Sequence, residues 1–392
     1  MQKPEQPDAS PIIFFFMSVI IFVINIVYIK YILHKRLRVM EKKKILILCS
    51  AVVLANTFLT TFNNRAMAKE PIPQTSSTFI QKTIEQAYTK FKPVLDGQNA
   101  SYIPYLAKAD STLYGIAIVT VDGQIFKIGN SDHSFPVESV SKIFTLADVL
   151  QKKGTDTVLH KVGVNATGLP FNSVLAVELN NDKLGGSPPT GNPLVNAGAI
   201  ATASLVDGKT LETKWKSVLD TASAFAGHPL HLNEDVYRSE MASNQHNQAI
   251  AVLLHSYDSL YADPSETVDL YTRECSYDVT ALDLATMGAT LANGGTNPRT
   301  HQPVVDPATS AHVLAVMATA GLYNTSGEWL FKVGLPGKSG VGGGIVAVVP
   351  GKLAIGVYSS RLDTAGNSVR GQLAVQFIAE VLGTNIFASK AR

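Results

Sequence analysis

The chain has 392 residues, of which 46% are hydrophobic and 16% are charged, and its formal net charge is +2 at pH 7. These values suit a globular enzyme, and the near-neutral charge offers no basic surface for nucleic acid. The two cysteines, Cys49 and Cys275, are too few for a disulfide framework or a thiolate zinc site. We therefore expect neither a nucleic-acid partner nor a cysteine-based metal centre.

Two apolar runs occupy the N-terminal part of the chain. Residues 11–33 are nearly uncharged and long enough to span a bilayer, and the basic residues after them would hold the next linker in the cytoplasm. The second run, 45–62, lies between three lysines and a small-residue cleavage site, which is the pattern of a secretory signal peptide. We predict a signal peptide over residues 40–68 and a mature chain that begins near Lys69.

Two interpretations of residues 1–39 stay open. They form a transmembrane segment, or they are an upstream extension that results from taking Met1 rather than Met40 as the start. A third interpretation, in which both apolar runs are core helices, is disfavoured because neither run is amphipathic. Either of the first two places the rest of the chain outside the cytoplasm. The predicted location is therefore periplasmic or secreted, with or without an anchor in the inner membrane.

The segments after this leader predict a helix, a hairpin, a helical region and a second hairpin. Residues 76–95 carry apolar side chains at helical spacing. Residues 113–130 are two β-rich runs around an Asp-Gly dipeptide, and residues 342–360 are two further runs that turn at a Pro-Gly dipeptide. Helical patterns dominate residues 196–312 and return at the C-terminus.

This order, with strands early and late and helices between them, predicts an α+β fold rather than alternating βαβ units. The simplest assembly pairs both hairpins in one antiparallel sheet, covers the sheet with the terminal helices and makes the middle segment a helical lobe. A cleft between the lobe and the sheet is then the expected ligand site. The predicted catalytic domain spans residues 69–392.

A serine and a lysine stand three residues apart where a predicted apolar helix opens. Ser139 and Lys142 would share a helix face, so that the lysine reaches the serine oxygen. A neighbouring base activates a serine, burial lowers the pKa of a lysine toward that of a usable base, and a helix N-terminus favours an alkoxide. The pair alone is weak evidence, because a helix cap followed by a solvated lysine has the same spacing.

A Lys-Ser-Gly tripeptide strengthens the catalytic interpretation. It lies at residues 338–340, before the second hairpin, and Ser-x-x-Lys serine hydrolases carry a Lys-Thr-Gly or Lys-Ser-Gly strand along the active site. Gly340 would let a substrate approach the backbone closely. The backbone N–H groups of Ser139 and Val341 would then form an oxyanion hole. An ordinary glycine-rich turn is the alternative.

Several blocks of sequence resemble one enzyme family in one colinear order. They are "YIPYLAK", "TVDGQ", "ESVSKIF", "NPLVNAGAI", "TLANGG", "GLYNTSGEW", "VGLPGKSGVGGGI" and "GNSVRG". From about residue 78 to the C-terminus, the chain closely resembles the serine-dependent glutaminases. The resemblance implies a β-lactamase-like fold, and it implies hydrolysis of L-glutamine to L-glutamate and ammonia through a γ-glutamyl ester.

The resemblance also implies roles for individual residues. Ser139 would be the nucleophile and Lys142 its base. Tyr102 and Tyr323 would relay protons between the serine, the lysine and the leaving ammonia. The implied substrate-binding set is Ser139, Asn196, Glu240, Asn247, Tyr271, Tyr323 and the backbone of Val341. Within it, a carboxylate would accept from the substrate ammonium, while asparagine and tyrosine donors would hold the substrate carboxylate.

The sequence departs from the family pattern in two places. Glu138 precedes the serine where the family more commonly has glutamine, and the extra negative charge could disturb proton transfer or substrate placement. Residues 185–193 are rich in glycine and proline where relatives often carry basic residues. The apolar leader is not a general feature of the family either.

The expected small-molecule partner is L-glutamine, with no cofactor and no metal. The histidines predict no competing metal site, because His228 and His231 have no acidic residue at metalloenzyme spacing. Membrane contact is expected only through the N-terminal segment. The family implies a homodimer or a homotetramer.

Two other functions stay open. A penicillin-recognising serine peptidase or β-lactamase would use the same Ser-x-x-Lys logic, but "NPLVNAGAI" and "SEMASNQHN" resemble a pocket for a free amino acid. A solute-binding or scaffold protein without activity is the other alternative. The joint presence of Ser139, Lys142 and Tyr323 argues against it.

Overall fold

The computed structural model describes residues 76–180 and 188–388. The predicted transmembrane segment, signal peptide and cleavage point lie outside these ranges, as does the start of the glycine- and proline-rich segment at 185–193. Within the two ranges, no helix combines the length and the apolar character that a membrane crossing requires. The described residues belong to one compact unit, which spans residues 75–392.

Both predicted hairpins lie in the same antiparallel sheet, which confirms that part of the prediction. The strand order is β2-β1-β7-β6-β5, and each neighbouring pair is antiparallel. The strands are β1 (Gly115–Thr120), β2 (Ile125–Gly129), β5 (Gly337–Ser339), β6 (Gly344–Val349) and β7 (Leu353–Tyr358). The hairpins meet where β1 pairs with β7, with Gly115 opposite Tyr358.

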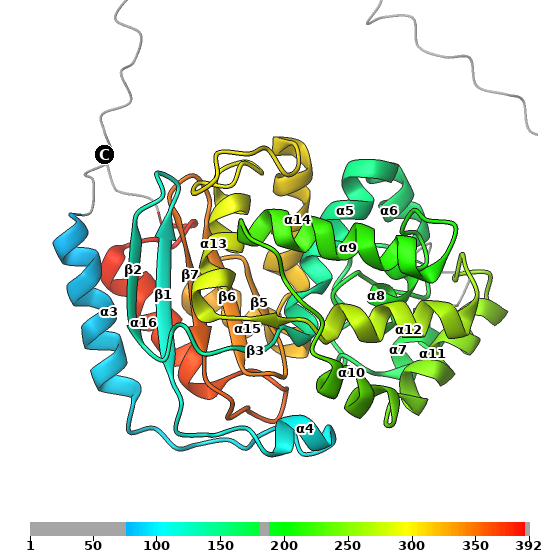
Figure 1. The fold of residues 1–392 in the computed structure, drawn as a ribbon, viewed down its shortest axis with the longest axis horizontal. Helices are drawn as coiled ribbons and strands as arrows, with labels where there is room; N and C mark the ends of the chain where they lie inside the picture. The colour runs from blue at the N-terminus through cyan, green and yellow to red at the C-terminus, as the bar shows by residue number, and fades with distance from the viewer. Residues whose placement is uncertain (1–75, 181–187, 389–392) are drawn as a thin grey trace, which may run out of the picture. The chain divides into compact units, whose positions relative to one another are not determined.

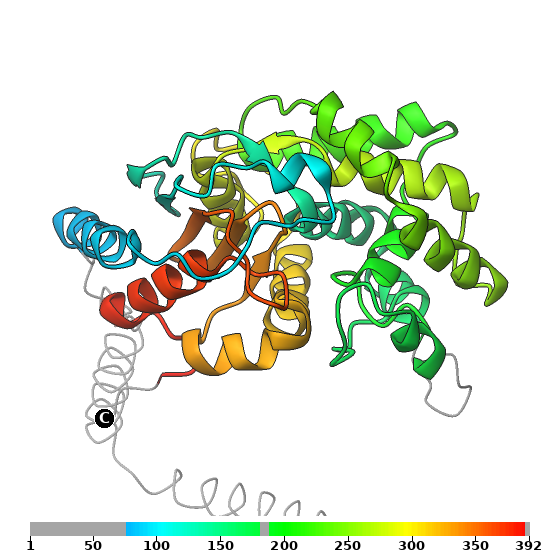
Figure 2. The same cartoon turned by 90° about the horizontal axis from the view of Figure 1, so that it is seen from below.

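Helices cover both faces of this sheet (Figures 1 and 2). α3 (Ser77–Phe91) and α16 (Val369–Leu382), from the two ends of the described chain, pack on one face as predicted. α13 (Ala281–Ala292) packs on the other face, so closely that a Cβ on Gly356 would lie 2.1 Å from the carbonyl oxygen of Ala281. β1, β6 and β7 are buried on both faces as a result, which explains why their sequences are apolar throughout.

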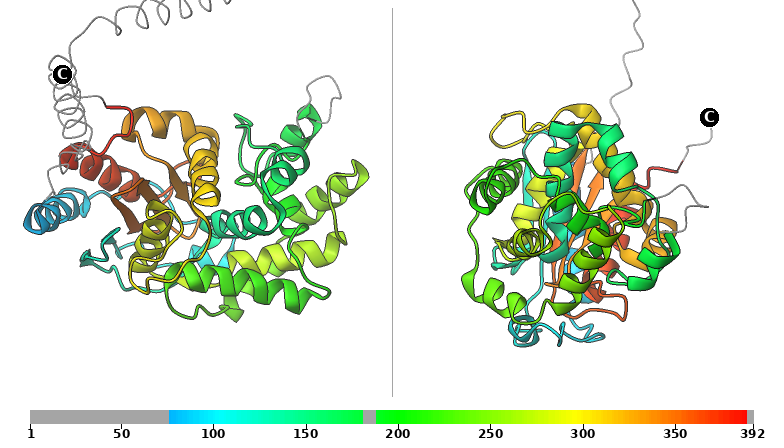
Figure 3. Two further views of the ribbon diagram at one scale, coloured as in Figure 1. Left: turned by 90° about the horizontal axis from the view of Figure 1, so that it is seen from above. Right: turned by 90° about the vertical axis from the view of Figure 1, so that its right-hand side faces the viewer.

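The middle of the chain forms the predicted helical lobe. Figure 1 shows it to the right of the sheet, and Figure 3 shows it from two further sides. Its helices are α5 (Lys142–Lys153), α6 (Thr155–Lys161), α7 (Val174–Asn180), α8 (Asn196–Ala203), α9 (Leu211–Ala226), α10 (Glu234–Met241), α11 (Gln245–Ser256) and α12 (Pro264–Cys275). α8 is buried along its whole length, which its small and apolar residues permit.

Shorter elements and two further helices complete the described fold. They are α4 (Pro104–Ala107), β3 (Phe135–Pro136), η1 (Glu138–Val140), β4 (Asp278–Val279), α14 (Pro307–Ala320), η2 (Tyr323–Thr325) and α15 (Ser326–Val333). β3 pairs with β4, and Phe135 lies opposite Val279. This pairing holds the segment that carries Ser139 beside the end of α12.

The serine does not open the α-helix, contrary to the sequence prediction. Ser139 lies in η1, a 3-10 turn, and α5 begins at Lys142. The reason is local: Glu138 has a φ of +50°, a left-handed conformation that an α-helix cannot contain. The hydroxyl of Ser141 donates to the Glu138 carbonyl at 2.7 Å and stabilises this turn.

Candidate active site

A pocket lies beside the helical lobe, and its lining comes from the lobe, from η1 and from loops that include the turn between β5 and β6. Its lining residues are Tyr102, Ile103, Glu138, Ser139, Phe171, Asn196, Glu240, Ser243, Asn244, Asn247, Tyr271, Cys275 and Val341. Most of the predicted site residues line this pocket. The other two, Lys142 and Tyr323, are buried beside it. The structure therefore brings together residues that stand more than two hundred positions apart in the sequence.

The predicted nucleophile lies against a buried tyrosine. Ser139 is 6% exposed, and its hydroxyl interacts with the phenol of Tyr323. Tyr323 has a φ of +59° in η2 and donates its phenolic hydrogen to the Ser339 carbonyl at 3.2 Å. Burial raises the pKa of Tyr323, although the hydrogen bonds from its serine neighbours act in the opposite direction. The phenol therefore stays protonated at neutral pH and can act as a hydrogen donor.

The predicted base is fully enclosed by protein. Lys142 is 1% exposed, and its Nζ donates to Oδ1 of Asn196 at 2.7 Å and lies 5.5 Å from the ring centroid of Tyr271. Burial lowers the pKa of Lys142 to about 8, and the nearby thiol and carboxyl groups partly oppose this effect. A lysine with this pKa is partly neutral at physiological pH, as a general base must be. The direct hydrogen bond between Lys142 and Ser139 stays a prediction.

Asn196 connects the predicted base to the predicted substrate-binding residues. Its Oδ1 accepts from Lys142 and also from the Tyr271 hydroxyl at 3.1 Å. Its Nδ2 donates to Oδ1 of Asn247 at 3.0 Å. Because Asn196 starts α8 and Tyr271 lies on α12, this hydrogen-bond network also ties two helices of the lobe together.

Two carboxyl groups and a thiol form the acidic end of the pocket. The functional atoms of Glu138, Glu240 and Cys275 all lie within 4.8 Å of one another, and each residue is buried. Burial raises the pKa of Glu240 to about 7, and burial together with the neighbouring Glu240 raises the pKa of Glu138. Burial also raises the pKa of the Cys275 thiol, which makes it a poor metal ligand. An organic ammonium suits the two carboxyl groups better than a metal ion does.

Tyr102 and Val341 lie at the rim of the pocket. Tyr102 is 56% exposed as a whole residue, but burial raises the pKa of its phenol, so the phenol stays protonated at neutral pH. The backbone N–H of Val341 donates to no acceptor among the residues that the structure describes. It is therefore free to donate to a substrate oxygen, as an oxyanion hole requires.

Sequence reasoning missed a second lysine and an aromatic neighbour. Lys338 is fully buried, its Nζ lies 4.3 Å from the ring centroid of Tyr323, and it donates to the Ser339 carbonyl. Burial lowers the pKa of Lys338 well below its usual range, and the charge of Lys142 acts in the same direction. The Lys-Ser-Gly tripeptide was the available signal, but it had suggested only a backbone role. The ring of Phe171 lies 4.9 Å from that of Tyr323, which no sequence signal indicated.

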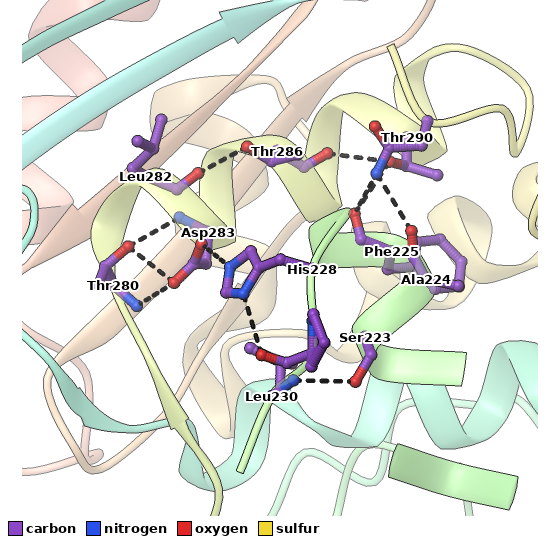
Figure 4. A network of polar contacts seen from close by, with 12 residues as sticks. Ser223, Ala224, Phe225, His228, Leu230, Thr280, Leu282, Asp283, Thr286 and Thr290 are labelled. Carbon is purple, nitrogen blue, oxygen red and sulfur yellow. Dashed lines mark hydrogen bonds and ion pairs between the residues drawn. The ribbon is translucent and has the colours of Figure 1, made fainter. Parts of the chain in front are cut away.

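His228 has a structural partner that is remote in sequence. Its Nε2 lies 2.7 Å from Oδ1 of Asp283, and its Nδ1 lies 3.0 Å from the Pro229 carbonyl (Figure 4). Partial burial lowers the pKa of His228, but Asp283 raises it more, so the net shift is upward. Since Asp283 also caps α13 through Thr280, the histidine ties the loop after α9 to the start of α13. Both ring nitrogens are occupied, which indicates a structural role.

Proteins with similar sequences are named glutaminase. The family model described as Glutaminase matches residues 97–387. A glutaminase from Brucella canis is 51% identical over 317 residues, which cover 81% of this chain and 98% of the relative. A glutaminase from Colwellia psychrerythraea is 50% identical over 321 residues, which cover 82% of this chain and 100% of the relative.

Solved structures agree with these sequence matches. One described as probable glutaminase ybaS has a TM-score of 0.77 and 48% identity, and the match covers 80% of this chain and 100% of that one. A structure of Mglu in a tris and glutamate form has a TM-score of 0.75 and 35% identity, and the match covers 80% of this chain and 68% of that one. The mixed fold of helices and antiparallel sheet is thus that of solved glutaminases. With a family model that matches residues 97–387 and a relative that is 51% identical over 317 residues, the chain belongs to the glutaminase family.

Proposed function

We propose that this protein hydrolyses the side-chain amide of L-glutamine to L-glutamate and ammonia, with Ser139 as the nucleophile. The observation that carries the proposal is the contact of Ser139 with the buried Tyr323, beside a pocket lined by two carboxyl groups, with the buried Lys142 of lowered pKa three residues along the chain. The solved glutamate form of Mglu is consistent with it, because glutamate is the expected product.

The acylation step uses the groups around Ser139. Neutral Lys142 takes the hydroxyl proton while the serine oxygen attacks the amide carbon of the substrate. The backbone N–H groups of Ser139 and Val341 stabilise the oxyanion that forms. The carbon–nitrogen bond then breaks, and the departing nitrogen receives a proton through the Tyr323 phenol and leaves as ammonia. The product of this step is a γ-glutamyl ester on Ser139.

Deacylation reverses the same proton path. A water molecule gives a proton to the amine of Lys142 as its oxygen attacks the ester carbon. The carbon–oxygen bond to Ser139 breaks, the serine oxygen regains a proton, and L-glutamate leaves. Tyr102 lines the same pocket and would relay protons between the serine, the lysine and the leaving ammonia.

The α-amino-acid end of glutamine would bind at the carboxyl groups that line the same pocket as Ser139. Glu240 lies where it can accept from the α-ammonium, and one of its oxygens is buried without a hydrogen-bond partner among the described residues. Asn247 can supply its side-chain N–H groups to the α-carboxylate, and Tyr271, whose hydroxyl donates to Asn196, lines the same pocket. A charged group bound on a desolvated carboxylate distinguishes a free amino acid from a peptide.

Ammonia release from L-glutamine, L-asparagine and a chromogenic β-lactam, measured side by side, tests the proposed activity. We expect turnover of glutamine and none of the lactam. Ser139→Ala should abolish turnover and retain glutamine binding, and Ser141→Ala serves as the matched control on the same turn. Near-normal turnover by the Ser139 variant would assign the nucleophile elsewhere. Turnover of the lactam alone would instead favour the penicillin-recognising alternative.

Export and assembly are further proposals that rest on the sequence. We propose that residues 1–68 direct residues 69–392 out of the cytoplasm, with cleavage near Lys69 or retention as an anchor. N-terminal sequencing of the exported protein decides between these outcomes, and recovery in the cytoplasm would refute both. We also propose a homodimer or homotetramer, which light scattering of the purified protein tests directly.

A further inference from the structure

Two buried carboxyl groups from different elements face each other in the pocket. Glu138 comes from η1 and Glu240 from α10, and they are 3% and 8% exposed. Their carboxylate oxygens lie within 4.8 Å of each other and of the Cys275 sulfur. One oxygen of each, Oε1, is buried without a hydrogen-bond partner among the described residues. Unpartnered buried acceptors are costly, so this pair is arranged for a ligand that donates hydrogen bonds.

The backbone holds Glu138 in this position. Its left-handed φ of +50° is unfavourable for a residue with a side chain and indicates a conformation that the surroundings impose. The glycine loop after β5 packs against the same side chain. A Cβ on Gly340 would lie 3.3 Å from Cβ of Glu138, and a Cβ on Gly342 would lie 3.1 Å from its Cγ. The loop backbone therefore passes close to Glu138, and side chains at these two glycines would crowd it.

Two carboxylates this close and this buried cannot both be charged while the pocket is empty. The two side chains are close enough to share a proton, and burial together with the neighbouring Glu240 raises the pKa of Glu138. The pair therefore holds at least one proton, and its titration belongs to both groups together.

The other titratable groups around the pair come from several elements. Lys142 on α5 is the nearby cation, whereas Cys275 on α12 and the phenols of Tyr102 and Tyr323 are neutral near pH 7. With the pocket empty, one negative charge on the pair balances the charge of Lys142. When a second cation enters, a second negative charge can form on the pair.

We propose that Glu138 is a specificity residue for the substrate α-ammonium: it shares a proton with Glu240 in the empty pocket, and the pair releases that proton when the ammonium binds. Both carboxylates then accept hydrogen bonds from the ammonium through the oxygens that lack partners. The inference rests on the proposed function, because it assigns the ammonium end of glutamine to this pocket. It differs from recognition by Glu240 alone in requiring that binding expel a proton.

The proposal predicts a linkage between pH and affinity. If binding releases one proton, the dissociation constant falls tenfold for each unit of pH over the range in which the pair is protonated only in the empty state. We expect the affinity to rise at least about tenfold between about pH 6 and pH 8. A site with a permanently charged carboxylate would change little over this range.

Isothermal titration calorimetry measures the released proton directly. Ser139→Ala is titrated with L-glutamine near pH 7 in two buffers of different ionisation enthalpy, so that no turnover intervenes. We expect about one proton released for each glutamine bound. In Ser139→Ala with Glu138→Gln, the amide still donates to Glu240 but carries no titratable proton, so the release should fall below about half a proton. Equal release in the two proteins would overturn the proposal.

Two controls separate this result from other titrations. Glu274→Gln removes another buried carboxyl on α12 that does not line the pocket, and it should leave the release unchanged. The glutamine analogue without the α-amino group should bind weakly and release no proton. Release with this analogue would assign the proton to the carboxylate end and refute the inference.

Steady-state kinetics with Ser139 intact test the same inference if the double variant does not fold. The ratio of KM at about pH 6 to KM at about pH 8 should be at least about tenfold in the parent and about threefold or less in Glu138→Gln. An unchanged ratio refutes the role of Glu138. If the parent releases no ammonia from glutamine, the proposed function is wrong. If it does turn over glutamine but the ratio of the two KM values is the same in Glu138→Gln, only this inference is wrong.

Discussion

Replacing Asn196 by aspartate tests the assignment of Lys142 as the base. Oδ1 of Asn196 lies 2.7 Å from Nζ of Lys142, so Asn196→Asp places a carboxylate in contact with the ammonium without changing the size of the side chain. The new negative charge favours protonated lysine and should raise the pKa of Lys142 from its value of about 8.

The size of the effect follows from the separation. Two unit charges about 4 Å apart attract by about 4 kcal/mol at an effective dielectric constant of about 20. Burial of the new carboxylate offsets part of this energy, and opposite charges at this range typically shift a pKa by about 1–3 units. We therefore expect the midpoint of the kcat–pH curve to move upward by at least about one unit. At pH 7 this corresponds to a loss of kcat of about tenfold or more, because fewer lysines are neutral.

The assay is ammonia release at saturating glutamine from about pH 6.5 to pH 10, fitted for kcat alone. Asn247→Asp is the matched control, because Asn247 accepts from Asn196 rather than from Lys142. Both variants should raise KM by repelling the substrate carboxylate, but only Asn196→Asp should move the midpoint strongly. An unchanged midpoint, or equal shifts in both variants, would show that the titration of kcat does not report Lys142.

Three further outcomes follow from buried or paired side chains. Glu240→Gln leaves the substrate ammonium unpaired, which costs roughly 2–5 kcal/mol. The value of kcat/KM should fall at least tenfold, with most of the effect on KM. A change within experimental error would show that Glu240 has only a structural role. Burial raises the pKa of Glu274 from 4.5 to about 8, so the native chain keeps a proton that the unfolded chain loses, and stability declines as pH rises through this window. Glu274→Gln removes that decline. The unfolding temperature of the variant minus that of the parent should therefore increase from about pH 5 to pH 8, and a difference that stays constant would contradict the burial argument. The pKa of His228 is raised, so its pairing with Asp283 stabilises the fold below that pKa and less above it; His228→Gln should therefore destabilise the protein more at about pH 5.5 than at pH 8, and chemical unfolding at both pH values measures the contrast.

Local sequence patterns were sufficient to predict the antiparallel sheet and the terminal helices that pack on it. Asp-Gly and Pro-Gly turns between apolar runs define the two hairpins, and their turns fix the pairing within each. We could predict that β1 pairs with β7 because two hairpins bury more apolar surface in one sheet than they do apart. The serine and the lysine could be named because their spacing in the chain already brings them close.

The rest of the site depends on contacts that no local pattern encodes. Asn196 lies 54 residues from Lys142, and only the folded lobe brings its amide oxygen to the ammonium. The left-handed conformation of Glu138, close to the loop after β5, could not be predicted because glutamate has no intrinsic preference for it. Burial decides the charge states of these groups, and burial of a charged residue is a property of the whole fold.

The two buried lysines near Ser139 illustrate this dependence on surroundings. Burial lowers the pKa of both, but carboxyl groups surround Lys142 and restore part of the loss, so its pKa is about 8. The neighbours that act on Lys338 include Lys142, whose positive charge lowers its pKa further, and they include no carboxyl group. Burial and the charge of Lys142 thus both favour the neutral form of Lys338, which donates a hydrogen bond to the Ser339 carbonyl beside Tyr323. The two lysines therefore differ in what acts on them: nearby acidic groups favour the charged form of Lys142, whereas the charge of Lys142 itself disfavours a charge on Lys338.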